Sequence, residues 1–131
     1  MTSSSSIFES ELSVDDTAAA LEAAAAEANW GHLATHDLAA RMAARGINFP
    51  VPVRIVEICH PEYANGVLSD DLEISAAMPC RVAIFEKEGK TWMSTILPSK
   101  ILPHYSMGEN GNAAGETAEK ELLEILQKAS S

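Results

Sequence analysis

The pattern of apolar and polar positions predicts two long helices, one near each end of the chain. The first helix, over residues 14–29, has apolar residues at helical spacing: Val14, Ala18, Leu21 and Ala25. Ser13 precedes this run and is placed to accept hydrogen bonds from the free N–H groups of the first turn. The second helix, over residues 117–128, has Leu122, Ile125 and Leu126 on one face.

Runs rich in β-branched and aromatic residues between these helices predict strands. The predicted strands are residues 7–12, 32–35, 53–60, 80–86 and 91–97. The tetrapeptide Lys87-Glu88-Gly89-Lys90 joins the last two as a hairpin. Strands and helices in this order predict an α+β fold in a single domain that spans residues 1–131.

Shorter segments complete the prediction. Two short helices are expected, over residues 38–45 after Asp37 and over residues 62–68 after Pro61. We expect the Ser-rich residues 1–6 to be flexible. The glycine-containing residues 104–116 are predicted to form a flexible loop.

Composition excludes several classes of partner. Of 131 residues, 47% are hydrophobic, which is typical of a folded domain, and the net charge of −10 opposes binding to nucleic acid or to anionic lipid. No apolar run approaches the roughly 20 residues that span a bilayer. The N-terminal residues lack the basic and apolar regions of a secretory signal, so we expect a cytoplasmic protein.

The two cysteines carry the most distinctive chemistry of the sequence. Cys59 lies at the end of one predicted strand, and Cys80 begins the next. If these strands pair antiparallel, both cysteines lie at the same edge of the sheet, whereas a parallel crossover would place them at opposite edges. The connection between them is long enough for either arrangement.

Residues near the cysteines extend the candidate site. Thiolate, thioether and imidazole groups are the ligands that soft ions such as Cu(I) and Zn(II) prefer. The candidate metal ligands are Cys59, Cys80, His60 and Met78, with Glu57, Arg81 and His36 as candidate outer partners. Alternatively, Arg81 or His60 could lower a cysteine pKa for thiol redox chemistry. Free cysteines are also common as small buried apolar residues.

Three segments resemble the domain-of-unknown-function 302 family. They read GHLATHDLAARMAARG, VRIVEICHPEYANGVLSDD and MPCRVAIFEKEGKTWMSTILP, and the similarity spans residues 30–102. The resemblance implies a fold like that of the TATA-binding-protein class, with a largely antiparallel sheet packed by an N-terminal and a C-terminal helix. It also implies a homodimer, and it favours the arrangement that brings Cys59 near Cys80. The family usually has asparagine where this chain has His60.

Three functions remain open from the sequence. The first is a binding protein for a soft metal ion, with copper the favoured candidate, at Cys59 and Cys80. The second is a thiol redox protein that uses the same two residues. The third is a module without catalysis that binds a small molecule or a protein and has structural cysteines. No nucleophile elbow, phosphate-binding loop or zinc-protease motif occurs, so no catalytic residue is predicted.

Overall fold

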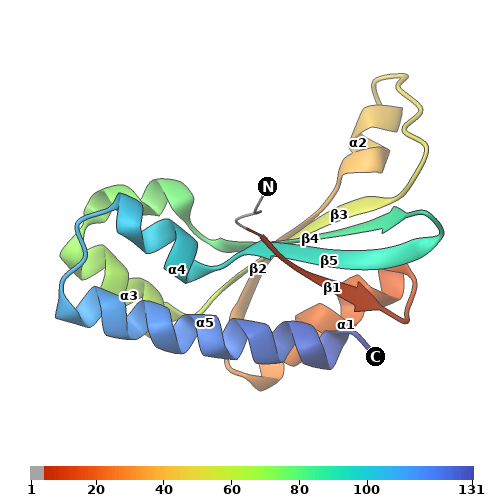
Figure 1. Cartoon of the computed structure of the whole chain (residues 1–131). Helices are drawn as coiled ribbons and strands as arrows, with labels where there is room; N and C mark the ends of the chain where they lie inside the picture. The colour runs from red at the N-terminus through yellow and green to blue at the C-terminus, as the bar shows by residue number, and fades with distance from the viewer. Residues whose placement is uncertain (1–4) are drawn as a thin grey trace.

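A computed structural model describes residues 5–131 and contains one five-stranded sheet (Figure 1). The strands are β1 (Ser5–Ser10), β2 (Gly31–Asp37), β3 (Val53–Cys59), β4 (Cys80–Lys87) and β5 (Lys90–Ile96). Their order across the sheet is β1-β5-β4-β3-β2, and every neighbouring pair is antiparallel. The predicted α+β class and the antiparallel sheet are therefore confirmed. Within the described residues, no helix is both long and apolar enough to cross a bilayer.

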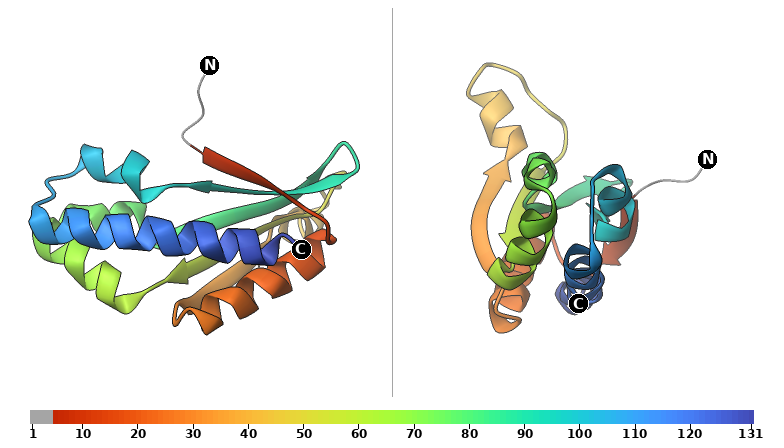
Figure 2. Two further views of the ribbon diagram at one scale, coloured as in Figure 1. Left: turned by 60° about the horizontal axis from the view of Figure 1, so that its bottom comes forward. Right: turned by 90° about the vertical axis from the view of Figure 1, so that its left-hand side faces the viewer.

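Two long helices, α1 (Val14–Glu27) and α5 (Glu109–Ala129), cover one face of the sheet (Figure 2). Alternate residues of the central strands point to this face and are buried: Val56, Ile58, Val82, Ile84 and Met93. Leu21 of α1 and Leu122 of α5 are also fully buried among them. These are the helix faces that the apolar spacing predicted. Ser13 caps α1 as expected, with its side chain accepting a hydrogen bond from the N–H of Asp16.

The opposite face of the sheet is not covered by α1 or α5 (Figure 2). It presents the residues that alternate with the core positions, including Ile7 of β1 and Ile96 of β5, which are 57% and 50% exposed. We call this surface the open face. Beside it rises a projection, residues 38–52, that we call the arm. The arm consists of helix α2 (Leu38–Ala43) and the segment that returns to β3 (Figure 1).

The end of the molecule remote from the arm is built from short helices. They are α3 (Pro61–Asp70), η1 (Leu72–Ala77), α4 (Pro98–Ile101) and η2 (Leu102–His104). A second, smaller apolar cluster lies among them, with Val67, Ile74 and Leu102 buried. Helix α3 approaches α5 closely at Gly66, where an added Cβ would lie 2.7 Å from the Cβ of Ala114.

The prediction of a flexible loop over residues 104–116 is wrong, because α5 already begins at Glu109. The carboxylate of Asp70, at the end of α3, accepts hydrogen bonds from the N–H groups of Gly108 (2.8 Å) and Gly111 (2.6 Å). These donors belong to the first turn of α5, which lacks a side-chain cap of its own. An added Cβ at Gly111 would lie 2.5 Å from this carboxylate, so the glycine permits the contact.

Other boundaries differ by smaller amounts. Of the residues predicted to be flexible at the N-terminus, 1–4 lie outside the described residues, while Ser5 and Ser6 begin β1. The segment before Met78, for which no element was predicted, contains the 3₁₀ helix η1. Asp37 caps α2, and Gly46 adopts a φ of 79° after it, as expected for the residue that ends a helix.

Replacement of Asp70 tests its contribution to the start of α5. Asp70→Ala removes a charged acceptor from two backbone donors and should lower the free energy of unfolding by about 2 kcal/mol. The measurement is urea denaturation followed by circular dichroism. Glu124→Ala, on the exposed side of the same helix, is the control and should change stability by less than about 0.5 kcal/mol. Equal stability of the two variants would contradict the capping role.

Candidate functional site

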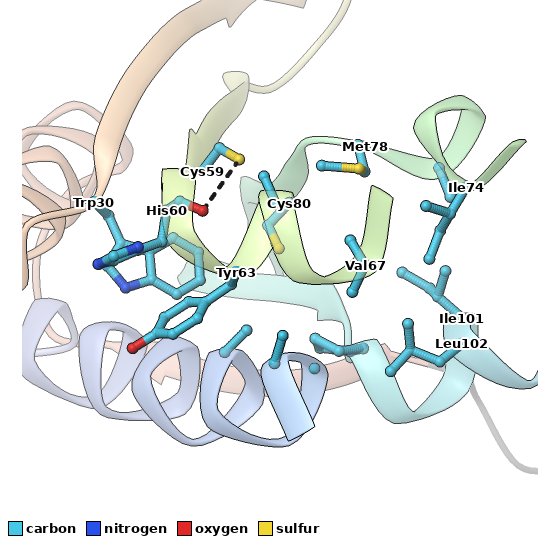
Figure 3. A pocket seen from close by; sticks show the side chains of 16 residues that line it. Trp30, Cys59, His60, Tyr63, Val67, Ile74, Met78, Cys80, Ile101 and Leu102 are labelled. Atoms are coloured by element: carbon cyan, nitrogen blue, oxygen red, sulfur yellow. Dashed lines mark hydrogen bonds between the residues drawn. The ribbon is translucent and has the colours of Figure 1, made fainter. Parts of the chain in front are cut away.

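A cavity of about 70 Å³ lies where the ends of β3 and β4 meet α3, α4 and α5 (Figure 3). Its aliphatic wall consists of residues from the short helices and α5, including Val67, Ile74, Ile101, Leu102 and Ala118. Trp30, His60 and Tyr63 supply an aromatic wall. The volume exceeds the roughly 10–15 Å³ that one water molecule requires, so the cavity can hold a small ligand.

The four predicted metal ligands, Cys59, Cys80, His60 and Met78, all line this cavity. Cys59 ends β3, His60 precedes the first turn of α3, and Cys80 begins β4. Antiparallel pairing of β3 with β4 places both cysteines at the same edge of the sheet, as the resemblance implied. The structure therefore confirms that the two cysteines lie at one edge of the sheet, while their role stays a prediction.

The register of β3 and β4 nevertheless directs the two thiols to different faces. Cys80 lies opposite Ile58, and residues directly opposite each other share a face, so Cys80 points to the helix-covered side. Cys59 follows Ile58 and points to the other side. Figure 3 shows the Cys80 sulfur directed into the cavity, whereas the Cys59 sulfur turns toward the carbonyl oxygen of His60, 3.9 Å away. Both cysteines are free thiols.

Burial controls the chemistry of these thiols. Desolvation is the main reason that the pKa of the Cys80 thiol rises to about 11, and the nearby Cys59 adds to this shift. Desolvation also raises the pKa of half-buried Cys59. Both groups are therefore protonated near neutral pH, and a protonated thiol is a poor nucleophile. The protonated Cys80 thiol therefore acts as a small apolar side chain in the cavity wall.

His60 is the N-cap residue of α3. Its Nδ1 accepts a hydrogen bond from the N–H of Glu62 at 3.2 Å. Asparagine, usual at this position in the resembled family, is a preferred N-cap residue, so His60 can replace it in this role. Because Nδ1 is an acceptor here, the neutral ring carries its proton on Nε2. The His60 ring also stacks on Tyr63, with centroids 4.2 Å apart.

Two residues of the aromatic wall, Trp30 and Tyr63, form a cluster with Glu121 of α5. The Trp30 Nε1–H donates to Glu121 Oε1 at 2.9 Å, and the Tyr63 hydroxyl donates to Glu121 Oε2. The sequence analysis assigned no role to any of these three residues. Glu121 could have been noticed as an acidic residue next to Leu122, within the apolar stripe of the last helix.

These contacts change the acidity of both partners. The hydrogen bond to Glu121 is the main reason that the pKa of Tyr63 rises to about 12, with desolvation and the negative charges of Glu121 and Glu62 adding to it. Partial burial acts to raise the pKa of Glu121, but the hydrogen bonds from Tyr63 and Trp30 and the nearby His60 outweigh it, so the pKa is lowered. Glu121 is therefore an ionised acceptor of the hydrogen bond that the Tyr63 hydroxyl donates.

The predicted outer partners form a separate network on the open face. Glu57 Oε2 accepts from the Arg81 Nε–H at 3.1 Å, and Glu57 Oε1 lies 3.3 Å from His36 Nε2. The hydrogen bonds from Arg81 and His36 lower the pKa of Glu57. This network lies on the same face of the sheet as Cys59. Cys80 points to the opposite face, so the network does not surround it. Within residues 5–131, no group of three or more histidine, cysteine or acidic side chains is arranged to hold a metal ion.

Comparison with known proteins places the chain in a family. Residues 7–129 match the family model described as domain of unknown function DUF302. The chain belongs to the DUF302 family. This confirms the resemblance and extends it to both long helices, beyond the segment over which the sequence motifs were similar.

A crystal structure described as the uncharacterized conserved protein DUF302 from Bacillus stearothermophilus has a similar fold. The TM-score is 0.85 at 21% sequence identity, and the alignment covers 98% of this chain and 99% of that one. At this identity the similarity shows the DUF302 fold alone. A search of curated proteins finds no match.

Spectrophotometric titration tests the hydrogen bond within the cluster. In a Tyr105→Phe background, Tyr63 is the single remaining tyrosine, and its absorbance near 295 nm should report a pKa of about 12. The raised pKa stabilises the folded state below pH ~10, and this contribution is lost as the pH rises toward 12. Glu121→Gln should return the pKa toward about 10. Readings taken immediately after a pH jump avoid unfolding, and an unchanged pKa in Glu121→Gln would refute the assignment.

Proposed function

We propose that the chain is a binding protein for a small, mainly apolar ligand that occupies the cavity between α3 and α5. The supporting observation is a lining of aliphatic and aromatic side chains, of which Trp30 and Tyr63 hydrogen-bond to Glu121. Ligand sites in proteins commonly combine an apolar lining with a few placed polar groups. The proposal assigns no covalent step, because the Cys80 thiol is protonated near neutral pH.

The arrangement of the walls favours a particular ligand chemistry. The cavity volume of about 70 Å³ suits a short aliphatic chain, or the edge of one ring, better than a large cofactor. The Tyr63 hydroxyl donates a hydrogen bond to Glu121, and Figure 3 shows it directed away from Val67 and Leu102. We therefore expect a small ligand that is mainly apolar. Its apolar part would lie against Val67 and Leu102.

Binding of small probes tests this site. We expect 1-butanol and phenol to shift the amide resonances of α3 and α5 in ¹H–¹⁵N spectra, with saturable dependence on concentration. Cys80→Leu places a larger side chain in the cavity and should weaken binding at least tenfold, which corresponds to about 1.4 kcal/mol. Ala113→Leu is the matched control and should bind as the unaltered chain does, because Ala113 is exposed on α5 and does not line the cavity. Equal binding by Cys80→Leu would refute the proposal.

A soft metal ion, Cu(I), is a second candidate ligand. The observation that favours it is that two thiols, one thioether and one imidazole line a single cavity. Binding would require loss of the thiol protons, which burial opposes, and rotation of Cys59 toward Cys80. Because of these two requirements, we prefer the apolar ligand to Cu(I) as the proposed ligand.

Anaerobic titration with Cu(I) against a competing chelator tests the metal candidate. Stoichiometric binding is expected, and Cys80→Ser should abolish it while the protein remains folded by circular dichroism. Affinity should rise with pH, because the thiols must release protons whose pKa values are raised. Undiminished binding by the double variant Cys59→Ser/Cys80→Ser would exclude a site at these residues.

A further inference from the structure

A second hollow, of about 510 Å³, lies between helix α5 and the segment of α4 and η2 that precedes it. We call it the outer hollow. Residues between Ser99 and Met107 form one wall, and the other wall belongs to α5. Hydrogen bonds order these walls, since the Ser99 N–H donates to Glu119 Oε1 at 2.8 Å and the Tyr105 N–H donates to Leu102 O at 3.0 Å.

The outer hollow adjoins the cavity between α3 and α5, because Leu102 and Gly115 line both spaces. The Leu102 side chain lies directly against Gly115, where an added Cβ would be 2.2 Å from Leu102 Cδ1. Figure 3 shows Leu102 at the end of the cavity remote from Trp30. Since glycine has no side chain, Leu102 supplies the only side chain in the wall that the two spaces share.

The lining of the outer hollow differs from that of the cavity because it contains carboxylates. Glu116 and Glu119 are three residues apart on α5 and therefore lie on the same side of the helix. Glu119 binds the Ser99 N–H through Oε1, which leaves Oε2 free of that bond. Within residues 5–131, neither carboxylate takes part in an ion pair. Three basic residues lie next to lining residues in the sequence but do not line the hollow: Lys100, His104 and Lys120.

An aromatic side chain lines the same hollow. Tyr105 is half-buried and packs, together with Met107, against the smaller apolar cluster. An ammonium group is attracted both by carboxylates and by the face of an aromatic ring. The outer hollow therefore favours a cationic group, whereas the adjoining cavity favours an aliphatic one.

We propose that the cavity and the outer hollow form one site, and that its ligand is a short alkylamine in the ammonium form. This inference rests on the proposed function, since the aliphatic chain occupies the same cavity. Rotation of the Leu102 side chain to another staggered position joins the two spaces. The alkyl chain then lies in the cavity, and the ammonium group lies beside Glu116 and Glu119. A neutral alcohol matches only the cavity, and a carboxylic acid would be repelled by the two carboxylates.

Matched amine and alcohol probes test the ligand class. n-Hexylamine and 1-hexanol have the same chain length, and ¹H–¹⁵N spectra at neutral pH and low salt report the binding of each. We expect the amine to bind about tenfold more tightly and to compete with 1-butanol. Amide resonances near Val67 and near Glu116 should shift with one dissociation constant. In Glu116→Gln/Glu119→Gln, the advantage of the amine should fall to about twofold or less, while the glutamine Oε1 can still accept from Ser99.

Glu88→Gln/Glu124→Gln is the matched control, because it removes two charges from exposed glutamates that do not line the outer hollow. This variant should keep the full advantage of the amine. Three results would overturn the inference and leave the proposed function intact: 1-hexanol binding without an advantage for the amine, an equal loss of the advantage in both double variants, or no competition between the amine and 1-butanol. If neither the amine nor any alcohol binds, the inference and the proposed function are both overturned.

Discussion

Antiparallel pairing of β3 with β4, in the register that sets Val56 opposite Val82 and Ile58 opposite Cys80, organises both the core and the candidate site. This register brings the apolar residues of both strands to the helix-covered face, where α1 and α5 bury them. A shift by one residue would exchange the two faces and expose this core, so burial holds the register strongly. The same constraint directs the Cys80 thiol to the helix-covered face and the Cys59 thiol to the opposite face.

The cavity depends on contacts between segments that are distant in sequence. Asp70 joins the end of α3 to the start of α5 through two backbone N–H groups, and Glu121 joins α5 to Tyr63 of α3 and to Trp30. Between these two connections, Gly66 and Ala114 allow the helices to approach closely. The helices are therefore fixed at both ends of their contact, and the cavity lies between that contact and the edge of the sheet.

Most elements could be predicted because their causes are local. The apolar spacing of α1, the capping side chains of Ser13 and Asp37, and the hairpin at Gly89 each lie within a few residues of the element that they specify. The start of α5 could not be predicted in this way, because the Asp70 carboxylate that caps it is 38 residues from Gly108 along the chain. Glycines that suggest flexibility in the sequence instead provide room for that carboxylate.

The sequence by itself determined the α+β class and the family, because residue spacing and motifs record these directly. Spacing left open whether the cysteines, His60 and Met78 gather, and the antiparallel pairing of β3 with β4 brings them to one cavity. Only the tertiary structure decided how those groups face one another. Strand alternation separates the two thiols, helix capping engages His60 Nδ1, and burial keeps Cys80 protonated. These outcomes depend on register and desolvation, which arise from contacts between distant segments. For that physical reason, a set of residues that resembles metal ligands in the sequence forms mainly an apolar cavity wall in the folded chain.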